Sequence, residues 1–164
     1  MLDFITVFYL LSVHFIADFV FQTNEMAVNK SKSNYYLSLH VMVYSLTLFF
    51  LLMPFVLYRS FNNATPDLGI LFITFVLING LLHYVTDYVT SRLNAFLYKN
   101  AEFYNKKVEL YKPYISKDDS AYTFRYEKCQ KRANFFRHYF FVSIGFDQLI
   151  HYFCLFITFT YLGL

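Results

Sequence analysis

Long apolar runs alternate with short polar stretches along this chain, and four of the runs could cross a bilayer as helices, which takes about 20 residues each. The four runs lie near residues 3–23, 36–58, 68–91 and 138–162. Between the last two, residues 92–137 are polar and rich in Tyr. The pattern predicts an all-α polytopic membrane protein: one integral membrane domain over residues 1–164, a four-helix transmembrane bundle, and a long connector between helices three and four.

Polar residues interrupt the apolar runs at regular steps of four. The three stripes are His14–Asp18–Gln22, Asn79–His83–Asp87 and Ser143–Asp147–His151, and His40 stands alone in the second run. Residues four apart share one helix face. Ionisable groups at membrane depth are costly and usually face a bundle interior, a water-filled cavity or a site. One such pair is more often a packing device, but three pairs and a further His favour a built site.

Composition agrees with a membrane protein. The chain has 164 residues, of which 57% are hydrophobic and only 15% charged, whereas a soluble domain carries about 25% charged residues. Cys129 and Cys154 are the only cysteines, and their spacing predicts neither a disulfide framework nor a thiolate metal site. The first apolar run has no basic start, so we expect it to be a retained span rather than a cleaved signal.

The basic residues are unevenly distributed. Eleven of the 14 Lys and Arg residues lie between Arg92 and Arg137, and Lys30 and Lys32 lie between the first two runs. Basic loops face the cytoplasm, which predicts a multi-pass protein with both termini outside and the His and Asp stripes in the cytoplasmic half or near mid-membrane. We expect the connector to be mainly a solvated cytoplasmic segment with headgroup contacts, and its partner to be acidic lipid rather than nucleic acid. Part of it could form an amphipathic helix along the membrane, broken at Pro113.

The stripes offer the ligand types that zinc, manganese or iron accept, without a soft thiolate. The candidate metal ligands are His14, Asp18, His40, His83, Asp87 and His151. A ligating imidazole normally donates its other ring N–H to a neighbouring group. His14 and His83 could therefore orient the ligands instead of binding the metal themselves. Gln22, Asn79 and Gln148 could do the same through neutral hydrogen bonds. A bound divalent metal could lower the pKa of a water to about 7, and Asp147 could then act as the catalytic base.

Four sequence pieces are recognisable together and in this order: H-F-I-A-D-F-V-F-Q-T at 14–23, L-H-V-M-V-Y at 39–44, L-L-H-Y-V-T-D at 81–87 and F-D-Q-L-I-H at 146–151. With them, the chain resembles DUF3307, a family of small bacterial and phage membrane proteins of unknown function. The resemblance singles out His14, Asp18, Gln22, His40, His83, Asp87, Asp147, Gln148 and His151. It implies a place in the bacterial inner (cytoplasmic) membrane and no particular activity.

Three functions fit the pattern. The first is a metal-dependent hydrolase acting at the cytoplasmic leaflet on a lipid-linked or phosphoester substrate, with membrane lipids around it. The second is a transporter or channel for metal ions or protons, which would have to form a homo-oligomer because four helices are few for alternating access. The third is a non-catalytic, phage-type factor that binds a host membrane complex, in which the stripes specify helix packing. The sequence leaves all three open and favours the first, a membrane-embedded hydrolase.

Overall fold

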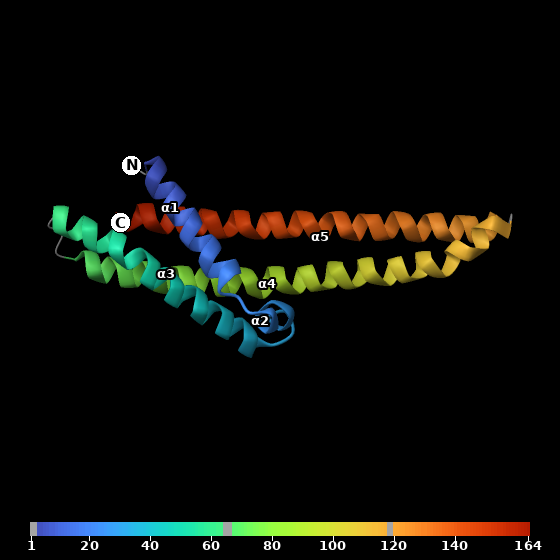
Figure 1. Cartoon of the computed structure of the whole chain (residues 1–164), viewed down its shortest axis with the longest axis horizontal. Helices are drawn as coiled ribbons and strands as arrows, with labels where there is room; N and C mark the ends of the chain where they lie inside the picture. Colours follow the sequence, from blue (N-terminus) through green and yellow to red (C-terminus); the bar gives the residue numbers. More distant parts are fainter. Residues whose placement is uncertain (1–2, 64–66, 118–119) are drawn as a thin grey trace. The chain divides into compact units, whose positions relative to one another are not determined.

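The computed structural model of the chain describes residues 3–63, 67–117 and 120–164, and every element in these ranges is helical. The elements are α1 (Phe4–Phe15), a π-helical turn (Ile16–Val20), α2 (Asn24–Asn29), α3 (Asn34–Asn63), α4 (Leu68–Tyr111), a 3-10 helix (Lys112–Lys117) and α5 (Ser120–Tyr161) (Figure 1). The predicted all-α fold class is confirmed.

The chain forms two compact units. The first unit comprises Met1–Val89 and Gln148–Leu164, and the second comprises Thr90–Asp147. Both long helices α4 and α5 therefore contribute one end to each unit.

The core of the first unit is built where α1, α3, α4 and α5 meet. Phe49 of α3 stacks on Phe72 of α4 with ring centroids 5.3 Å apart, and Phe75 of α4 meets Phe159 of α5 edge to face at 5.8 Å. Asn79 of α4 donates to the Thr158 hydroxyl of α5 at 2.8 Å. These contacts hold the three helices together on one side of the polar residues described in the next section.

Three helices in the described ranges are long and apolar enough to cross a membrane: Asn34–Phe61, Leu68–Ile115 and Ala121–Tyr161. The first apolar run gives a shorter helical segment, Phe4–Val20. It ends before residue 23 because the helix widens into the π-helical turn, after which Thr23 caps α2 by accepting the backbone N–H of Met26 at 3.3 Å. Three of the four predicted spans thus have the required length, and the four-helix transmembrane bundle stays a prediction.

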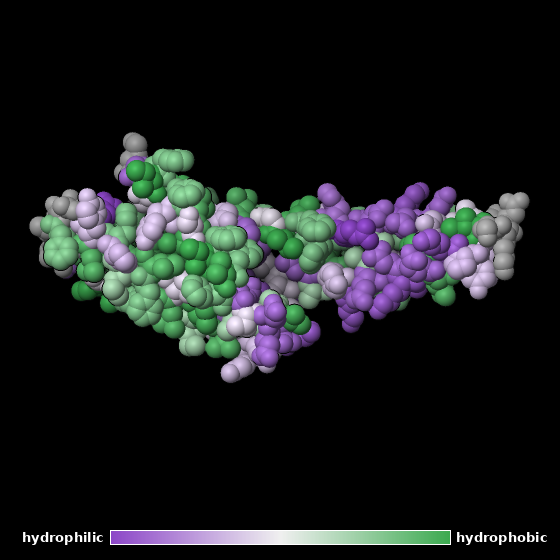
Figure 2. Space-filling view, viewed as in Figure 1, coloured by the Kyte–Doolittle hydropathy of each residue, from purple (hydrophilic) through white to green (hydrophobic). Residues whose placement is uncertain are grey.

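Large apolar side chains cover much of the first unit's surface. Each of the following is more than 60% exposed: Phe4, Ile5, Phe50, Ile70, Leu77, Leu81 and Phe153. Figure 2 shows hydrophobic residues over the visible face of the first unit, whereas hydrophilic residues gather over much of the second. Soluble monomers rarely expose apolar patches this extensive, so the surface of the first unit is suited to contact with lipid.

The second unit pairs the later part of α4 with the earlier part of α5. Tyr104 stacks on Phe136 and accepts a hydrogen bond from Arg132 at 2.7 Å, and Arg137 donates to the Asn105 side chain at 3.0 Å. The predicted connector 92–137 is therefore mostly helical, because α4 continues to Tyr111 instead of ending near residue 91. The expected break at Pro113 is present as the 3-10 helix.

Candidate metal centre

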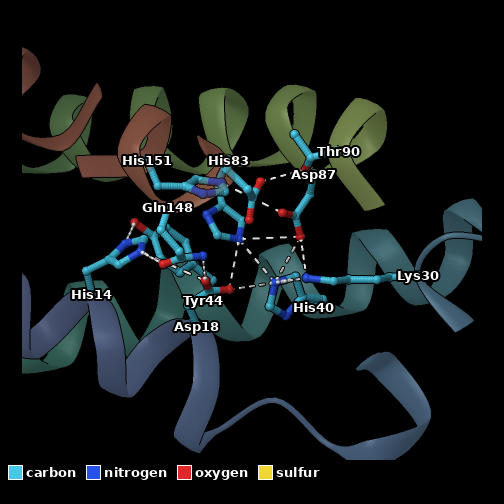
Figure 3. A network of polar contacts seen from close by, with 11 residues as sticks. His14, Asp18, Lys30, His40, Tyr44, His83, Asp87, Thr90, Gln148 and His151 are labelled. Carbon is cyan, nitrogen blue, oxygen red and sulfur yellow. Dashed lines mark hydrogen bonds and ion pairs between the residues drawn. The ribbon is translucent and has the colours of Figure 1, made fainter. Parts of the chain in front are cut away.

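All six predicted metal ligands lie in one polar cluster inside the first unit (Figure 3). The cluster draws side chains from every long helix of the unit and from the π-helical turn: His14 from α1, Asp18 from the turn, His40 from α3, His83 and Asp87 from α4, and His151 from α5. Each of the six is at most 4% exposed. The six predicted ligands therefore lie together in one buried site.

Asp18 is placed by the five-residue π-helical turn Ile16–Val20. Such turns are rare, and they occur frequently at functional sites. The two oxygens of the Asp18 carboxylate contact different residues. Oδ2 accepts a hydrogen bond from the Gln148 amide at 3.1 Å, while Oδ1 lies 3.1 Å from His40 Nε2 and 3.5 Å from His83 Nε2. Asp18 thus links α5 with the two imidazoles of α3 and α4.

His40, His83 and Asp18 present three donor atoms to a common centre. His40 Nε2 and His83 Nε2 are 3.1 Å apart, which closes a triangle with edges of 3.1, 3.1 and 3.5 Å. In a tetrahedral site with metal–ligand distances of about 2.0–2.1 Å, neighbouring donor atoms lie about 3.3–3.4 Å apart. The triangle therefore has the dimensions of one face of a metal's coordination tetrahedron.

The tautomers of His40 and His83 decide what this triangle can bind. If both imidazoles carried a proton on Nε2, two N–H groups would face one another across 3.1 Å. If the protons lay on Nδ1 instead, both Nε2 lone pairs would be free to bind a cation, although His40 Nδ1 and His83 Nδ1 are buried and lack hydrogen-bond partners among the described residues. A cation at the centre would serve both Nε2 lone pairs and the carboxylate oxygen together.

Asp87 and Lys30 form an ion pair beside the triangle. Asp87 Oδ2 lies 3.2 Å from His40 Nε2 and 3.7 Å from His83 Nε2, and it accepts a hydrogen bond from Lys30 Nζ at 2.7 Å. Lys30 Nζ is also 3.4 Å from His40 Nε2. A second carboxylate and a fixed ammonium therefore stand next to the candidate metal position.

His14 and His151 extend the cluster on the other side of Asp18. His14 Nδ1 lies 3.2 Å from the Tyr44 hydroxyl, and His14 Nε2 lies 3.4 Å from the Gln148 side-chain oxygen. His151 Nε2 is 3.8 Å from Asp87 Oδ1. Two further groups have ligand atoms close enough to hold an ion, namely His14 with Asp18 and His151, and His83 with Asp87 and His151.

The predicted supporting residues differ in their contacts. Gln148 joins His14 to Asp18, as described above. Gln22, with its amide oriented to satisfy both ends, donates to the Asp18 backbone oxygen at 3.2 Å and accepts from Lys30 Nζ at 3.3 Å. Asn79 instead donates to Phe75 O and to Thr158, which joins α4 to α5. Gln22 and Gln148 thus contact the cluster directly, and the hydrogen bonds of Asn79 go elsewhere.

Asp147 belongs to the second unit, where its Oδ1 accepts a hydrogen bond from the Thr90 hydroxyl at 2.6 Å. Its role as a catalytic base stays a prediction. The carboxylate that lies beside the triangle is that of Asp87, whose Oδ2 is 3.2 Å from His40 Nε2.

Lys30 and Tyr44 were missed by the stripe argument. Tyr44 lies four residues after His40 on α3, and its ring stacks on His83 with centroids 3.9 Å apart. Its spacing of four residues from His40 was the sequence feature that could have placed Tyr44 on the same helix face as His40. Lys30 lies outside every apolar run, and its place in the first polar loop indicated only the orientation of the chain in the membrane.

The charges of the cluster are unbalanced. With neutral imidazoles, the carboxylates of Asp18 and Asp87 and the ammonium of Lys30 leave one net negative charge. An uncompensated charge in a buried site is costly. A divalent ion would reverse the net charge to one positive, and a single imidazolium would bring it to zero. The cluster can therefore hold a cation or a proton.

Comparison with known proteins identifies the family. The chain belongs to the family described as "Protein of unknown function (DUF3307)", whose sequence profile matches residues 6–164, nearly the whole chain. The resemblance stated from the sequence pieces is thus confirmed. No curated protein matches the chain, and no solved structure does.

Proposed function

We propose that this chain is a membrane-embedded, metal-dependent hydrolase whose centre is formed by Asp18, His40 and His83. The observation that supports it best is the triangle of donor atoms, with edges of 3.1, 3.1 and 3.5 Å in a buried site. Catalytic metal sites commonly have three protein ligands and keep a further position open for water or substrate. A divalent ion there, whether zinc, manganese or iron, would polarise the substrate and acidify a water molecule.

The neighbouring residues would supply the remaining chemistry. Asp87 stands within 3.2 Å of His40 Nε2 and would accept the proton of the attacking water. Gln148 would hold the Asp18 carboxylate in place through its hydrogen bond to Oδ2. Gln22 would do so through the backbone oxygen of Asp18.

The substrate class follows from the setting. Three helices that could span a membrane surround or adjoin the site, and the first unit exposes an apolar surface. Eleven of the 14 basic residues lie in 92–137, and basic segments attract anionic headgroups. In this proposal the protein lies in the bacterial cytoplasmic membrane with these residues on the cytoplasmic side, and it acts on a lipid-linked phosphoester or ester.

The test is the metal content of the full chain purified in detergent, measured by elemental mass spectrometry. We expect about one transition-metal ion per chain in the wild type, and its loss in Asp18→Asn, His40→Gln and His83→Gln. His138→Gln is the matched control, because His138 is exposed and belongs to the second unit. It should keep the metal.

Hydrolysis is then measured with phosphoester and carboxyl ester probes, before and after metal removal. Loss of turnover on chelation and its recovery on adding back the ion would support the proposal. Folded, metal-free wild-type protein without turnover on any probe would contradict it.

A proton pathway is the second candidate, because the cluster forms one connected polar chain from a partly exposed cation inward. The contacts run in the order Lys30, Asp87, His40, Asp18, Gln148 and His14. Titratable chains inside a membrane are typical of proton relays. Proton flux into liposomes that is abolished by Asp18→Asn, in a protein without metal, would favour this function over hydrolysis.

A further inference from the structure

The ammonium of Lys30 lies beside the triangle formed by Asp18, His40 and His83 (Figure 3). Lys30 belongs to none of the polar stripes in the sequence. Its Nζ lies 2.7 Å from Asp87 Oδ2 and 3.4 Å from His40 Nε2. The Lys30 side chain is 17% exposed, whereas the Asp87 side chain is 2% exposed. Lys30 therefore connects the buried Asp87 carboxylate with the surroundings of the protein.

The backbone that carries Lys30 is fixed. Lys30 caps the C-terminus of α2, and its backbone N–H donates to Met26 O at 2.9 Å. The following turn is closed by Lys32 N and Ser33 N, which both donate to Asn29 O. Met26 itself is buried. This short, capped element directs the Lys30 side chain into the cluster, so the ammonium has a defined position.

Three acceptors occupy the three N–H groups that an ammonium offers. They are Asp87 Oδ2 at 2.7 Å, the Gln22 side-chain oxygen at 3.3 Å and, where this ring nitrogen carries no proton, His40 Nε2 at 3.4 Å. A metal ion bound to His40 would use the Nε2 lone pair. Metal binding would therefore end the Lys30–His40 contact and leave one N–H directed toward the coordination sphere, while Asp87 and Gln22 kept the nitrogen in place.

We infer that Lys30 is a catalytic residue that binds an anionic oxygen of a phosphoryl group, and that the substrate is a phosphodiester. The inference rests on the proposed function and deepens it. With a divalent ion bound, the cluster carries one net positive charge, which a singly charged phosphodiester would balance and a neutral carboxyl ester would not. A phosphoryl group also offers two non-bridging oxygens, one for the ion and one for Lys30, and fixed cations stabilise the charge that these oxygens carry in the transition state.

The reaction balances with water as the only co-reactant. The water oxygen forms a bond to phosphorus, and the bond between phosphorus and the leaving oxygen breaks. Asp87 takes one water proton and the leaving alkoxide receives it, while the other water proton stays on the phosphate monoester product. Lys30 remains protonated throughout and only binds the phosphoryl oxygen.

The test uses the full chain loaded with Co²⁺, whose visible spectrum reports ligand exchange, titrated with inorganic phosphate. Wild type is compared with Lys30→Met, Lys30→Gln and Lys30→Arg. Lys32→Met is the matched control, because Lys32 is an exposed cation in the same turn. We expect phosphate to bind about 10- to 100-fold more weakly to the Met and Gln variants, less weakly to the Arg variant, and unchanged to the control, with cobalt content equal in all.

A second readout is turnover of bis(p-nitrophenyl) phosphate against p-nitrophenyl acetate. The Met variant should lose about 10²- to 10³-fold in kcat on the phosphodiester and much less on the acetate. Equal phosphate affinity in wild type and Lys30→Met would overturn the role of Lys30. So would loss of cobalt from all three Lys30 variants but not from Lys32→Met, because Lys30 would then only hold the site together. Failure of the wild type to bind cobalt would instead overturn the proposed function itself.

Discussion

At the scale of single residues, the cluster depends on side chains that hold the imidazoles in place. Tyr44 contacts two of these imidazoles: its ring stacks on His83, and its hydroxyl lies 3.2 Å from His14 Nδ1. It is 2% exposed. Gln148 likewise contacts both His14 and Asp18. A ligand that must keep one orientation needs such neighbours, because metal affinity falls when outer hydrogen bonds and packing are removed.

Tyr44 therefore provides a residue-scale prediction. Tyr44→Phe should keep the stack on His83 and lower the free energy of unfolding by about 1 kcal/mol, the worth of one hydrogen bond. Tyr44→Ala should lower it by about 3–5 kcal/mol, as for other large buried side chains, and should also reduce metal content. Thermal unfolding in detergent and elemental analysis measure both effects. Tyr35→Ala is the control, since Tyr35 is 70% exposed on the same helix; equal stability of the two Ala variants would contradict the prediction.

At the scale of elements, the site depends on how closely α3 and α4 approach one another. Gly80 lies one turn before His83 on α4, and a Cβ atom at this position would come within 2.5 Å of Ser45 Oγ on α3. A side chain at residue 80 would therefore force the Ser45 hydroxyl to move, whereas the Ser45 Cβ, 3.7 Å away, would be in ordinary van der Waals contact. Sequence alone shows only a glycine in an apolar helix.

Gly80→Ala should therefore destabilise the protein by about 1–3 kcal/mol through overpacking. The same substitution in a Ser45→Ala background should cost much less, because the clashing hydroxyl is gone and residue 45 Cβ lies 3.7 Å from the added atom. A thermal-unfolding double-mutant cycle measures this coupling. Gly145→Ala is the control, as nothing lies within 4 Å of its added Cβ, and it should be neutral or stabilising. Additive effects of the substitutions at 45 and 80 would show that Ser45 does not limit the approach.

At the scale of the whole molecule, the cluster ties together all the long helices of the first unit. His14, His40, His83 and His151 come from four different helices. An ion held among them would cross-link α3, α4 and the π-helical turn, so that binding and folding of this unit would be coupled. Without a metal ion the cluster carries one net negative charge, which a bound cation would offset, so binding would also remove an electrostatic cost of folding.

Metal should therefore raise the Tm of the full chain. A ligand present at 100 times its Kd stabilises the folded state by about 2.7 kcal/mol, and chelation should remove that gain. The measurement is differential scanning fluorimetry of wild type and Asp18→Asn with added Zn²⁺, Mn²⁺ or Fe²⁺, and with a chelator. The wild type should respond to at least one ion while the variant does not. A metal-induced shift of equal size in both proteins would place the bound ion somewhere other than this cluster.

The sequence by itself determined the helical class, the apolar helices and the six His and Asp residues of the polar cluster. Five of these six follow from periodicity within one helix, where residues four apart share a face, and His40 follows from its place in an apolar run. The tertiary structure alone decided which atoms meet. His40 and His83 are 43 positions apart, and His14 and Gln148 are 134 apart, so their distances depend on how separate helices pack. The same packing brought Lys30 to Asp87 and joined Asn79 to Thr158, because these contacts join separate elements and no local pattern encodes them.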